Sequence, residues 1–349
     1  MNFTGKKILI TGHTGFKGTW LAHLLSHFGA NLYGVSLPPS AQDAFPDSHD
    51  RPTMIDRFTD IRNFGNVRDL VQEIEPDLVF HLAAQSLVLV SYESPLTTYE
   101  TNVMGTANLL EALRVSGNEC SVIVVTTDKV YKNIENNIGY SEEDPLGGLD
   151  PYSGSKSSVE ILVNSWRETT REAGKLKLMT VRSGNVIGGG DNARNRIIPD
   201  LIRSFRENKP ALIRNPESVR PWQHVLDTLY GYLLAAESLG QGTNSYNSYN
   251  FGPDYRSRIS VFELANQFAM KWPNACRIEK LESNVNSPKE TQVLWLNPTR
   301  AIEDLQWQSI LDIDDALDSI VEWECSTKQL GFFDRLQKQT KNYLEQVKL

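Results

Sequence analysis

Short apolar runs alternate with amphipathic stripes through the first half of the chain. The run Ile8–Thr11 is rich in β-branched residues, too short for a helix and followed by a glycine, which predicts a buried strand. Helical spacing of apolar residues after Gly18 predicts a helix that includes Trp20, Leu21, Leu24, Leu25 and Phe28. The same alternation predicts strands at Asn31–Ser36, Arg57–Thr59, Asp77–Leu82, Ser121–Thr126 and Leu176–Arg182, and helices at Val67–Ile74, Thr97–Val115 and Tyr152–Thr170. The polar stretch Ser40–Ile55, with its scattered prolines, is predicted as a loop.

Strands that alternate with helices over short links predict an α/β fold with a parallel, doubly wound sheet. After Gly184 this alternation weakens, and glycine, asparagine and proline increase. In this half we expect helices at Arg196–Arg206, Val225–Leu239, Ser260–Lys271, Asp314–Trp323 and Lys328–Val347, and strands at Ala211–Ile213 and Tyr249–Phe251. The chain is therefore divided into a domain at 1–184, to which some later segments return, and a smaller, partly interleaved lobe at 185–349. The lobe is expected to close over the C-terminal strand ends, where such sheets bind ligands.

Composition narrows the functional classes. A net charge of −8 argues against a general nucleic-acid surface. No segment reaches the roughly eighteen apolar residues of a membrane span, and Lys6 and Lys7 precede too few apolar residues to predict a signal peptide. Three cysteines lie far apart without a CxxC pair, which predicts a reducing cytoplasm and neither a disulfide nor a metal site.

Three glycines follow the first strand at a spacing of three, at Gly12, Gly15 and Gly18. In a strand–loop–helix unit they allow a tight turn, a close approach of backbone to a pyrophosphate, and packing of helix on strand. The phosphates would lie on the N–H groups of the helix N-terminus. The other interpretation is a tight turn without a ligand. The second strand ends at Ser36 instead of an acidic residue, so this pattern leaves NAD and NADP both open.

A second group of polar residues follows the strand Ser121–Thr126. Tyr152 and Lys156 are four residues apart and therefore project from one helix face. A phenol with a pKa near 10 is a poor base at pH 7, but a neighbouring ammonium favours the phenolate. The pair is thus a workable base for an alcohol that a dinucleotide oxidises. By itself a Tyr-x-x-x-Lys pattern is common on any helix; here it follows a glycine loop and a strand that ends in Thr126-Thr127-Asp128-Lys129.

With these motifs in order, the chain resembles the extended short-chain dehydrogenase/reductase superfamily, and within it the CDP-glucose 4,6-dehydratases. The resemblance covers nearly the whole chain. Its motifs are Gly12-His13-Thr14-Gly15-Phe16-Lys17-Gly18, Phe80-His81-Leu82-Ala83-Ala84-Gln85, Thr101-Asn102-Val103-Met104-Gly105-Thr106, Asp150-Pro151-Tyr152-Ser153, Gly184-Asn185-Val186-Ile187-Gly188-Gly189-Gly190-Asp191, Arg220-Pro221-Trp222-Gln223-His224-Val225 and Asn250-Phe251-Gly252-Pro253. Related dTDP-glucose dehydratases carry Thr-Asp-Glu where this chain has Thr127-Asp128-Lys129, and the lysine points to the CDP-sugar branch.

The resemblance implies a Rossmann-type fold and conversion of CDP-D-glucose to CDP-4-keto-6-deoxy-D-glucose, for deoxysugars of surface polysaccharide. NAD would accept a hydride from C4 and return it to C6 after water leaves across C5–C6. Tyr152 would be the base at O4, Lys156 would lower its pKa and hold the nicotinamide ribose, and Thr127 would hydrogen-bond O4. Asp128 would protonate the departing C6 hydroxyl, and burial would favour its protonated form. Lys129 would be the base at C5 or, if charged, would stabilise an enolate.

Cofactor contacts are implied in the same way, for Gly12, Thr14, Gly15, Phe16, Lys17, Gly18, Asp60, Ile61, Leu82, Ala83, Ala84, Asn102, Thr126, Tyr152 and Lys156. His13 or Lys17 could alternatively face the 2′-phosphate of NADP. On the substrate side the resemblance assigns Gln85, Asn185 and the diphosphate clamp of Arg220, Arg196 and Arg214, since a guanidinium matches phosphate geometry. His81 and His224 are interpreted as structural hydrogen-bonding residues.

This sequence departs from the family pattern at Ser86, Leu89, Gly154, Asn192 and Asn195. Leu89 and Asn192 lie in segments expected near the substrate, so a 4,6-dehydratase or 4-epimerase of another nucleotide sugar stays open. An epimerase needs no acid for a C6 hydroxyl and no base at C5, which makes Asp128 and Lys129 the discriminating residues. A non-catalytic protein that senses a dinucleotide is the alternative from a different class.

The family also implies a homodimer formed by two helices from each subunit. Helices Thr97–Val115 and Tyr152–Thr170 carry apolar residues beyond one stripe, at Val103, Leu109, Leu110, Leu113, Val159, Leu162, Val163 and Trp166. A core position for these residues is the alternative, because doubly wound sheets bury their helices.

Overall fold

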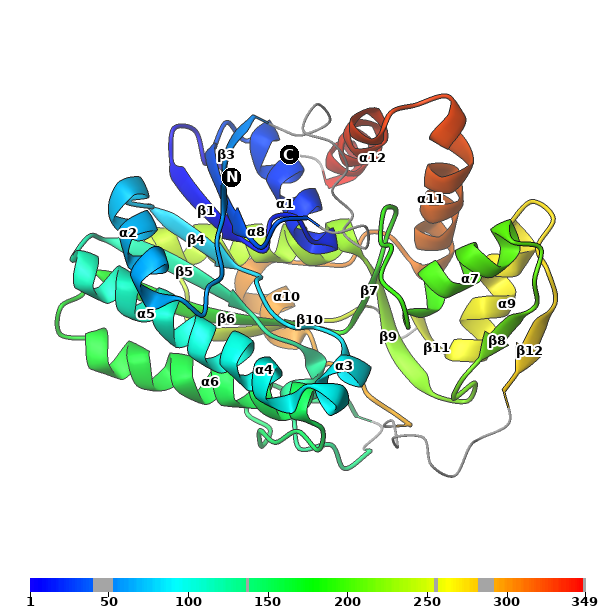
Figure 1. Cartoon of the computed structure of the whole chain (residues 1–349), viewed down its shortest axis with the longest axis horizontal. Coiled ribbons are helices and arrows are strands. Elements are labelled where there is room, and N and C mark those ends of the chain that lie inside the picture. Colours follow the sequence, from blue (N-terminus) through cyan, green and yellow to red (C-terminus); the bar gives the residue numbers. More distant parts are fainter. Residues whose placement is uncertain (40–52, 136–137, 254–256, 282–291, 348–349) are drawn as a thin grey trace.

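A computed structural model describes residues 1–39, 53–135, 138–253, 257–281 and 292–347. Its centre is a seven-stranded parallel sheet with the strand order β10-β6-β5-β4-β1-β2-β3 (Figure 1). The strands are β1 (Lys7–Thr11), β2 (Asn31–Ser36), β3 (Met54–Phe58), β4 (Leu78–His81), β5 (Cys120–Val125), β6 (Leu176–Ser183) and β10 (Ser248–Phe251). The predicted α/β class and doubly wound parallel sheet are confirmed.

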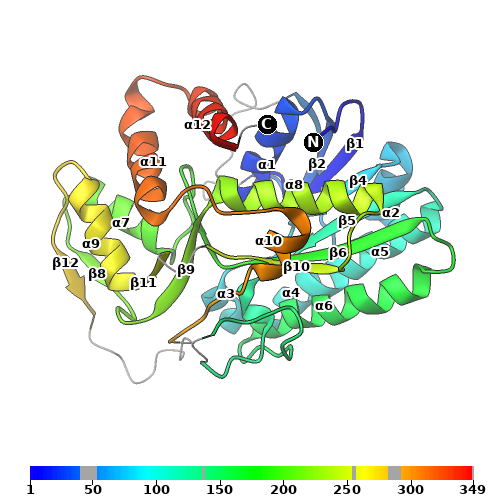
Figure 2. The same ribbon diagram turned by 180° about the vertical axis from the view of Figure 1, so that it is seen from behind.

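Helices cover both faces of this sheet, and each face has its own apolar core. One face packs against α1 (Phe16–His27), α8 (Val225–Gln241), α10 (Thr299–Leu305) and α12 (Phe332–Val347). Figure 2 shows α8 and α10 lying across the sheet from that side. The opposite face packs against α2 (Phe64–Ile74), α5 (Gly105–Ser116) and α6 (Pro151–Thr170). Strands buried on both faces explain why Val122, Ile123 and Val124 form an uninterrupted apolar run.

A smaller lobe lies beside the C-terminal ends of the strands (Figure 1). It holds a three-stranded sheet of β7 (Asn185–Ile187), β9 (Val219–His224) and β11 (Arg258–Ser260), and a pair of β8 (Ala211–Ile213) and β12 (Ile278–Lys280). Around them pack α7 (Ile197–Arg206), α9 (Val261–Lys271) and α11 (Ile313–Cys325). Of these strands, only β8 is predicted from the sequence pattern.

The two halves of the chain are interleaved. Strand β10, from the second half, pairs in parallel with β6 and forms one edge of the large sheet. Helix α8 fills the core of one face with Leu226, Leu229 and Leu233, all buried. Later segments thus return to the large domain. Within the described residues, no helix combines the length and apolarity that a bilayer crossing requires.

Three predicted elements differ from the structure. The predicted helix Thr97–Val115 consists of α4 (Pro95–Tyr99), a π-helical turn η2 (Glu100–Met104) and α5, because Asn102 turns inward to bond the backbone of Gln85. The last helix begins at Phe332 instead of Lys328, after a 3₁₀ turn η5 (Ser326–Lys328). Gly331, the residue before the helix, donates its N–H to the Asp334 carboxylate in the first turn.

Strand β3 begins at Met54, inside the predicted loop Ser40–Ile55 and ahead of the predicted Arg57, because its pairing with β2 starts at Leu32 opposite Met54. Residues 40–52 of that loop lie outside the described residues. The pattern also does not predict α3 (Val88–Glu93) and α10, which span only one to two turns.

Candidate active site

The glycine loop joins β1 to α1 by close backbone contacts. Gly12 has φ +76°, and a Cβ there would lie 2.8 Å from the Ala83 nitrogen. A Cβ on Gly18 would lie 2.1 Å from the Gly12 carbonyl oxygen, so only glycine lets the helix approach the loop. Gly15 precedes α1 and has no side chain to cap it, which leaves first-turn N–H groups for an anion. These features fit a dinucleotide.

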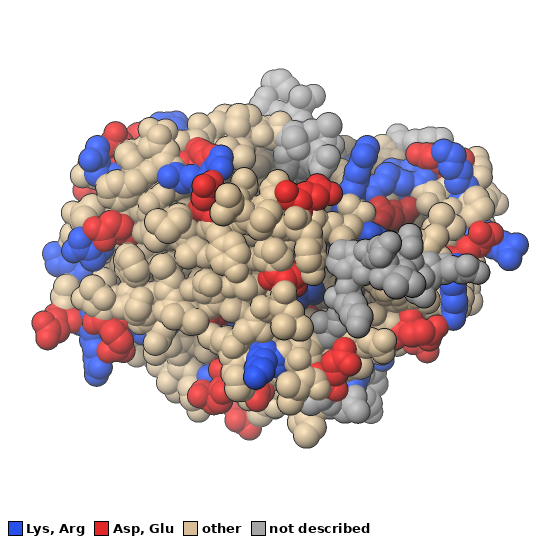
Figure 3. All heavy atoms as spheres, turned by 60° about the horizontal axis from the view of Figure 1, so that its bottom comes forward, with Lys and Arg blue, Asp and Glu red and all other residues tan. Residues whose placement is uncertain are grey.

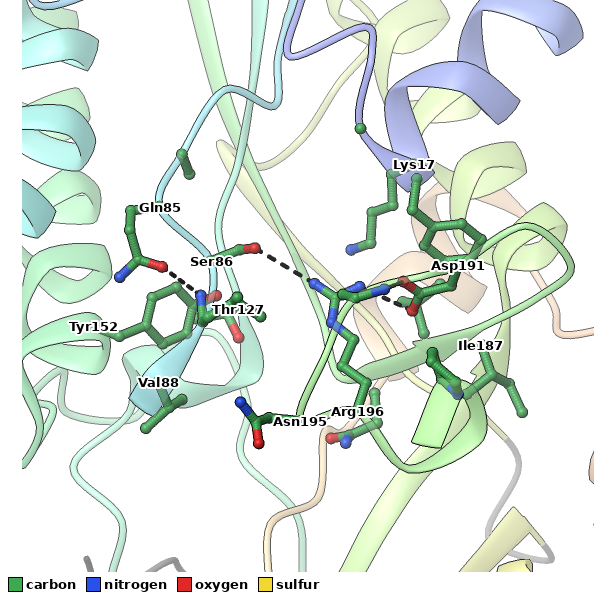
Figure 4. A pocket seen from close by; sticks show the side chains of 18 of the residues that line it. Lys17, Gln85, Ser86, Val88, Thr127, Tyr152, Ile187, Asp191, Asn195 and Arg196 are labelled. Carbon is green, nitrogen blue, oxygen red and sulfur yellow. Dashed lines mark hydrogen bonds and ion pairs between the residues drawn. The ribbon is translucent and has the colours of Figure 1, made fainter. Parts of the chain in front are cut away.

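The two basic residues of the loop both have polar partners within the protein. His13 is fully buried, and its Nε2 lies 3.2 Å from Oδ1 of Asp56 on β3. Lys17 points into the pocket (Figure 4), where its Nζ donates to Ser183 Oγ at 2.9 Å and Tyr232 Oη at 3.3 Å. Burial and the charges of Arg196 and Lys156 lower the pKa of Lys17 to about 7.

The polar group expected at the end of β5 comes together with α6. A 3₁₀ turn, η3 (Asp128–Val130), follows Thr127 and turns Asp128 inward, where it is 1% exposed. Thr127 Oγ1 donates to Asp128 Oδ1 at 2.9 Å, and Lys129 Nζ lies 3.6 Å from the same oxygen. Asp128 Oδ2 is buried and has no hydrogen-bond partner among the described residues.

Tyr152 and Lys156 lie on the first two turns of α6, and both are buried. The Asp150 side chain caps this helix at the Ser153 N–H, which fixes its start directly before Tyr152. Lys156 Nζ donates to the Val125 carbonyl at 3.0 Å. Burial raises the pKa of Tyr152 to about 12, while a hydrogen bond with Thr127 and the charge of Arg196 act in the opposite direction. Burial lowers the pKa of Lys156 to about 8.

Across the pocket lies a second group of residues from the smaller lobe (Figure 4). Arg196 Nη1 donates to Asp191 Oδ2 at 3.0 Å, and Arg196 Nη2 contacts Ser86 Oγ at 3.4 Å from the other wall. The Asn185 side chain lines the pocket, and its Oδ1 is buried without a hydrogen-bond partner among the described residues. Arg220 donates to the Gln292 carbonyl, so its head lies at the lobe wall.

A single cavity of about 780 Å³ connects these groups. Every predicted catalytic, cofactor and substrate residue lines it except Asn102. Asn102 is 1% exposed, and its amide bonds Gln85 and Ser155, so it fixes the backbone of a lining residue instead. Residues that sequence reasoning missed also line the cavity, among them Ser86, Thr97, Thr101, Ser183, Asp191, Asn195, Ser204, Leu212 and Trp222. Thr101, Asp191 and Trp222 stand inside motifs of the family resemblance, and Ser86 and Asn195 are departures from its pattern, whereas the others carried no sequence signal.

The histidines make the hydrogen bonds expected of structural residues. His81 lies between Thr11 Oγ1 at 2.7 Å and Thr106 Oγ1 at 2.9 Å. His224 caps α8 by accepting the Leu226 N–H at 3.2 Å. Burial lowers the pKa of both imidazoles to about 3, so both are neutral at physiological pH.

Comparisons with known proteins agree with this geometry. The family model for GDP-mannose 4,6-dehydratase matches residues 9–320. The chain is 40% identical to the CDP-glucose 4,6-dehydratase of Salmonella typhimurium over 326 residues, which cover 91% of this chain and 90% of that protein.

Two solved structures share the fold. Pal from Bacillus thuringiensis superposes with a TM-score of 0.79 at 25% identity, covering 92% of this chain and 99% of that one. The dTDP-glucose 4,6-dehydratase of Bacillus anthracis, solved in complex with NAD, superposes with a TM-score of 0.78 at 21% identity, covering 95% of this chain and 100% of that one. With its family model and its 40% identical relative each matched over most of the chain, this protein belongs to the nucleotide-sugar 4,6-dehydratase family of NAD-dependent extended short-chain dehydrogenases/reductases.

Proposed function

We propose that this protein dehydrates CDP-D-glucose to CDP-4-keto-6-deoxy-D-glucose. One observation carries the proposal: a single cavity brings Thr127, Asp128 and Lys129 from the end of β5 together with Tyr152 and Lys156 from α6. The glycine loop forms another part of the same wall. The identity of 40% to a CDP-glucose 4,6-dehydratase over nine tenths of both chains supports cytidine as the base.

The cofactor of this family is NAD. The uncapped N-terminus of α1 and the close-packed glycines would hold its pyrophosphate, and Ser36, Asp60 and Ile61 line the cavity where the adenosine would lie. The bound cofactor would supply the hydride chemistry, acceptance from C4 of the sugar and return at C6, so the reaction would need no outside reductant. Lys156 would hold the nicotinamide ribose through its buried ammonium.

Tyr152 would take the proton of the C4 hydroxyl. Its pKa of about 12 in the unliganded chain is too high for a base at pH 7, so nearby positive charge has to lower it during the reaction. Arg196 already acts in that direction, and Lys156 is proposed to do so once substrate excludes water. Thr127, which hydrogen-bonds Tyr152, would hold the same O4 atom.

Asp128 would protonate the departing C6 hydroxyl. Its Oδ2 is the buried oxygen without a partner, which leaves it for a ligand, while Thr127 holds Oδ1. Lys129 is 28% exposed and lies beside the same carboxylate. A neutral Lys129 would remove the C5 proton, and a charged one would stabilise the resulting enolate. Both roles require Lys129 to lie next to Asp128, and the two side chains are neighbours.

The diphosphate would lie between the lobe and the strand ends. Asn185 Oδ1 and the Arg196 guanidinium border that space, and Arg220 and Arg214 line it further into the lobe. Arg196 already bridges Asp191 and Ser86, so it could exchange the Ser86 contact for a phosphate oxygen without leaving the carboxylate.

A direct assay tests the substrate and the reaction. The protein is incubated with CDP-, dTDP-, GDP- and UDP-hexoses, and the 4-keto-6-deoxy product is measured by its absorbance in alkali. We expect product from CDP-glucose at the highest kcat/KM. Product from GDP-mannose alone would replace the substrate with that of the family model, and a C4 epimer without loss of water would replace the reaction.

We further propose a homodimer through α4, η2 and α6. The exposed apolar side chains on this face are Leu96, Tyr99, Met104 and Ile161, the first of which is 78% exposed. Figure 3, which brings the bottom of Figure 1 forward, shows broad areas without charged side chains there. Most residues that the sequence suggested for the interface, including Leu109, Leu113 and Val163, are instead buried in the core of the same subunit.

Sedimentation of point variants tests the dimer. Ile161→Asp places a charge on the proposed interface and should give a monomeric mass at micromolar concentration. Ile302→Asp, at an exposed residue of α10, is the matched control and should keep the mass of the unmodified protein. A monomeric mass for the unmodified protein would remove the proposal.

The three cysteines are free, which supports the expected cytoplasmic location.

A further inference from the structure

A buried ion pair lies directly behind the active site, and the proposed chemistry does not use it. Glu160 on α6 is 5% exposed, and Arg182 on β6 is 4% exposed. Glu160 Oε1 accepts from Arg182 Nε at 2.9 Å and Thr126 Oγ1 at 2.5 Å. Glu160 Oε2 accepts from Arg182 Nη2 and Thr180 Oγ1, each at 2.8 Å. Four donors therefore fix this carboxylate in one position.

The ion pair connects several strands. Arg182 Nη1 donates to the Tyr131 phenol at 2.7 Å, and Tyr131 donates to Asn250 of β10, also at 2.7 Å. Ion pairs of this kind are costly to bury, and apolar residues of similar volume are often at least as stabilising. Stability alone therefore gives little reason for charges here, and their neighbours suggest another role.

Lys156 is a functional neighbour on the same helix. Glu160 follows it by four residues, so both lie on one face of α6. Lys156 binds the carbonyl of Val125, and Glu160 binds the side chain of Thr126, so the last residue of β5 and the residue after it are held by consecutive turns of α6.

The other charged or titratable groups that act on Lys156 do not favour its ammonium form. The side-chain amine of Lys17, in the glycine loop, lies in the same cavity and is itself basic. The imidazole of His81, on β4, is neutral. Burial lowers the pKa of Lys156, and the Glu160 carboxylate raises it. The Arg182 guanidinium, on the far side of Glu160, carries a positive charge and pairs with that carboxylate.

We propose that Glu160 is a positioning residue of the active site, which holds the end of β5 against α6 and supplies the negative charge that keeps the Lys156 ammonium in place. Arg182 and Thr180 orient the carboxylate so that it serves both purposes. This inference rests on the proposed function, because it concerns the residue that would hold the nicotinamide ribose.

The test is the pH dependence of NAD binding, followed by the quenching of tryptophan fluorescence, together with the pH profile of kcat/KM. In Glu160→Gln the carboxylate charge is lost, and the alkaline midpoint of both curves should move down by about one pH unit. Glu160→Asp keeps the charge and should restore the midpoint even if activity stays low. Glu168→Gln, at an exposed residue two turns further along α6, is the matched control and should leave both curves unchanged.

A merely structural role would lower activity by the same factor at every pH, so a folded Glu160→Gln protein with an unmoved midpoint would overturn the proposal. If circular dichroism shows that this variant is unfolded, the double variant Glu160→Gln/Arg182→Gln, which leaves no unpaired buried charge, replaces it and is compared with Arg182→Gln, because both lack the Arg182 charge; equal midpoints would overturn the proposal. The binding curve separates the two proposals. A protein that binds NAD with the expected shift but converts no CDP-glucose would refute the proposed function and leave the role of Glu160 standing.

Discussion

At the scale of single residues, the two oxygens of Asp128 have different surroundings. Thr127 and Lys129 lie at Oδ1, whereas Oδ2 is buried without a partner among the described residues. A fixed oxygen beside a free one suits an acid that must be held in place and still reach a leaving hydroxyl. The two halves of the proposed reaction, oxidation at C4 and elimination of water, should therefore depend on different side chains.

Asp128→Asn should slow elimination by roughly 10²- to 10⁴-fold, the typical loss for a missing general acid. Oxidation at C4 should continue, because Tyr152 is unchanged. A 4-keto-hexose that still bears its C6 hydroxyl should then accumulate, and mass analysis of the quenched sugar measures it. Tyr152→Phe is the contrast and should give no keto sugar at all. Full dehydratase activity in Asp128→Asn would remove the assigned role.

Lys129→Met distinguishes the two roles left open for this lysine. A base at C5 is required for exchange of the C5 proton with solvent deuterium, so the variant should abolish that exchange while C4 oxidation continues. If Lys129 only stabilises an enolate, exchange should slow and yet remain measurable. Undiminished exchange would exclude both roles. The incorporated deuterium is read by mass spectrometry of the recovered sugar.

At the scale of elements, local pattern predicts the parts of the fold that are themselves local. The run Ile8–Thr11 and the spacing of Tyr152 and Lys156 are properties of neighbouring residues, and both lie where predicted. Strand β9 is different, because it exists through pairing with β7 and β11 from distant parts of the chain. The bridge from Asp191 through Arg196 to Ser86 likewise spans more than a hundred positions. Such pairings leave no periodic signal in the sequence.

The contact between β1 and α1 gives a prediction for the glycine loop. Gly18→Ala places a Cβ 2.1 Å from the Gly12 carbonyl oxygen, so helix and loop must separate. We expect a loss of about 1–3 kcal/mol in the free energy of unfolding, as for other overpacked sites, and weaker NAD binding. Gly15→Ala is the matched control for stability, since its Cβ would lie at an ordinary 3.4 Å from the same oxygen. Urea unfolding without ligand measures both, and equal stabilities would contradict the expectation.

One buried carboxylate in the first turn of α8 holds two later segments of the chain. Asp227 accepts the N–H groups of Ile310 and Leu311, the Ser309 hydroxyl and the Tyr343 phenol, and so attaches α12 and the segment that precedes α11 to α8. Asp227→Ala would leave several buried donors unpaired, and each such donor costs about 1–3 kcal/mol. We expect a marked fall in thermal midpoint. Proteolysis should cleave first near α12, and a protease-resistant C-terminus in the variant would argue against this attachment.

At the scale of the whole molecule, buried titratable groups set the response to acid. Burial lowers the pKa of His23, His81 and His224 to about 3 each, so the folded chain keeps them neutral. The unfolded chain protonates them near pH 6.5, and stability is therefore lost as pH falls below that value. Burial raises the pKa of Asp227 to about 6, so its contribution is largest below about pH 4 and is lost as pH rises through 6. Together the three histidines change the free energy of unfolding more than Asp227 does, so the folded protein should become less stable as the pH falls.

Urea unfolding between pH 5 and 6.5 tests this expectation. The free energy of unfolding should decrease on acidification, with more protons bound by the unfolded chain. His23→Phe removes one of these groups and should reduce the slope by up to about 1.4 kcal/mol per pH unit. The same slope in the variant and the unmodified protein would show that His23 does not contribute. His23 is suited to this test because its ring packs against Phe333 and its ring nitrogens have no hydrogen-bond partner among the described residues.

The insertion of β10 beside β6 bears on how the chain is made. A ribosome completes residues 1–184 before it reaches Ser248, so the nascent sheet ends at β6, with its edge unpaired and Met179 and Val181 uncovered by α8. Arg182 would at that stage lack the Asn250 end of its network. Unpaired apolar edges are sites of aggregation. The first half of the chain is therefore a poor candidate for expression by itself, and the nascent protein should need protection by a chaperone until β10 has emerged.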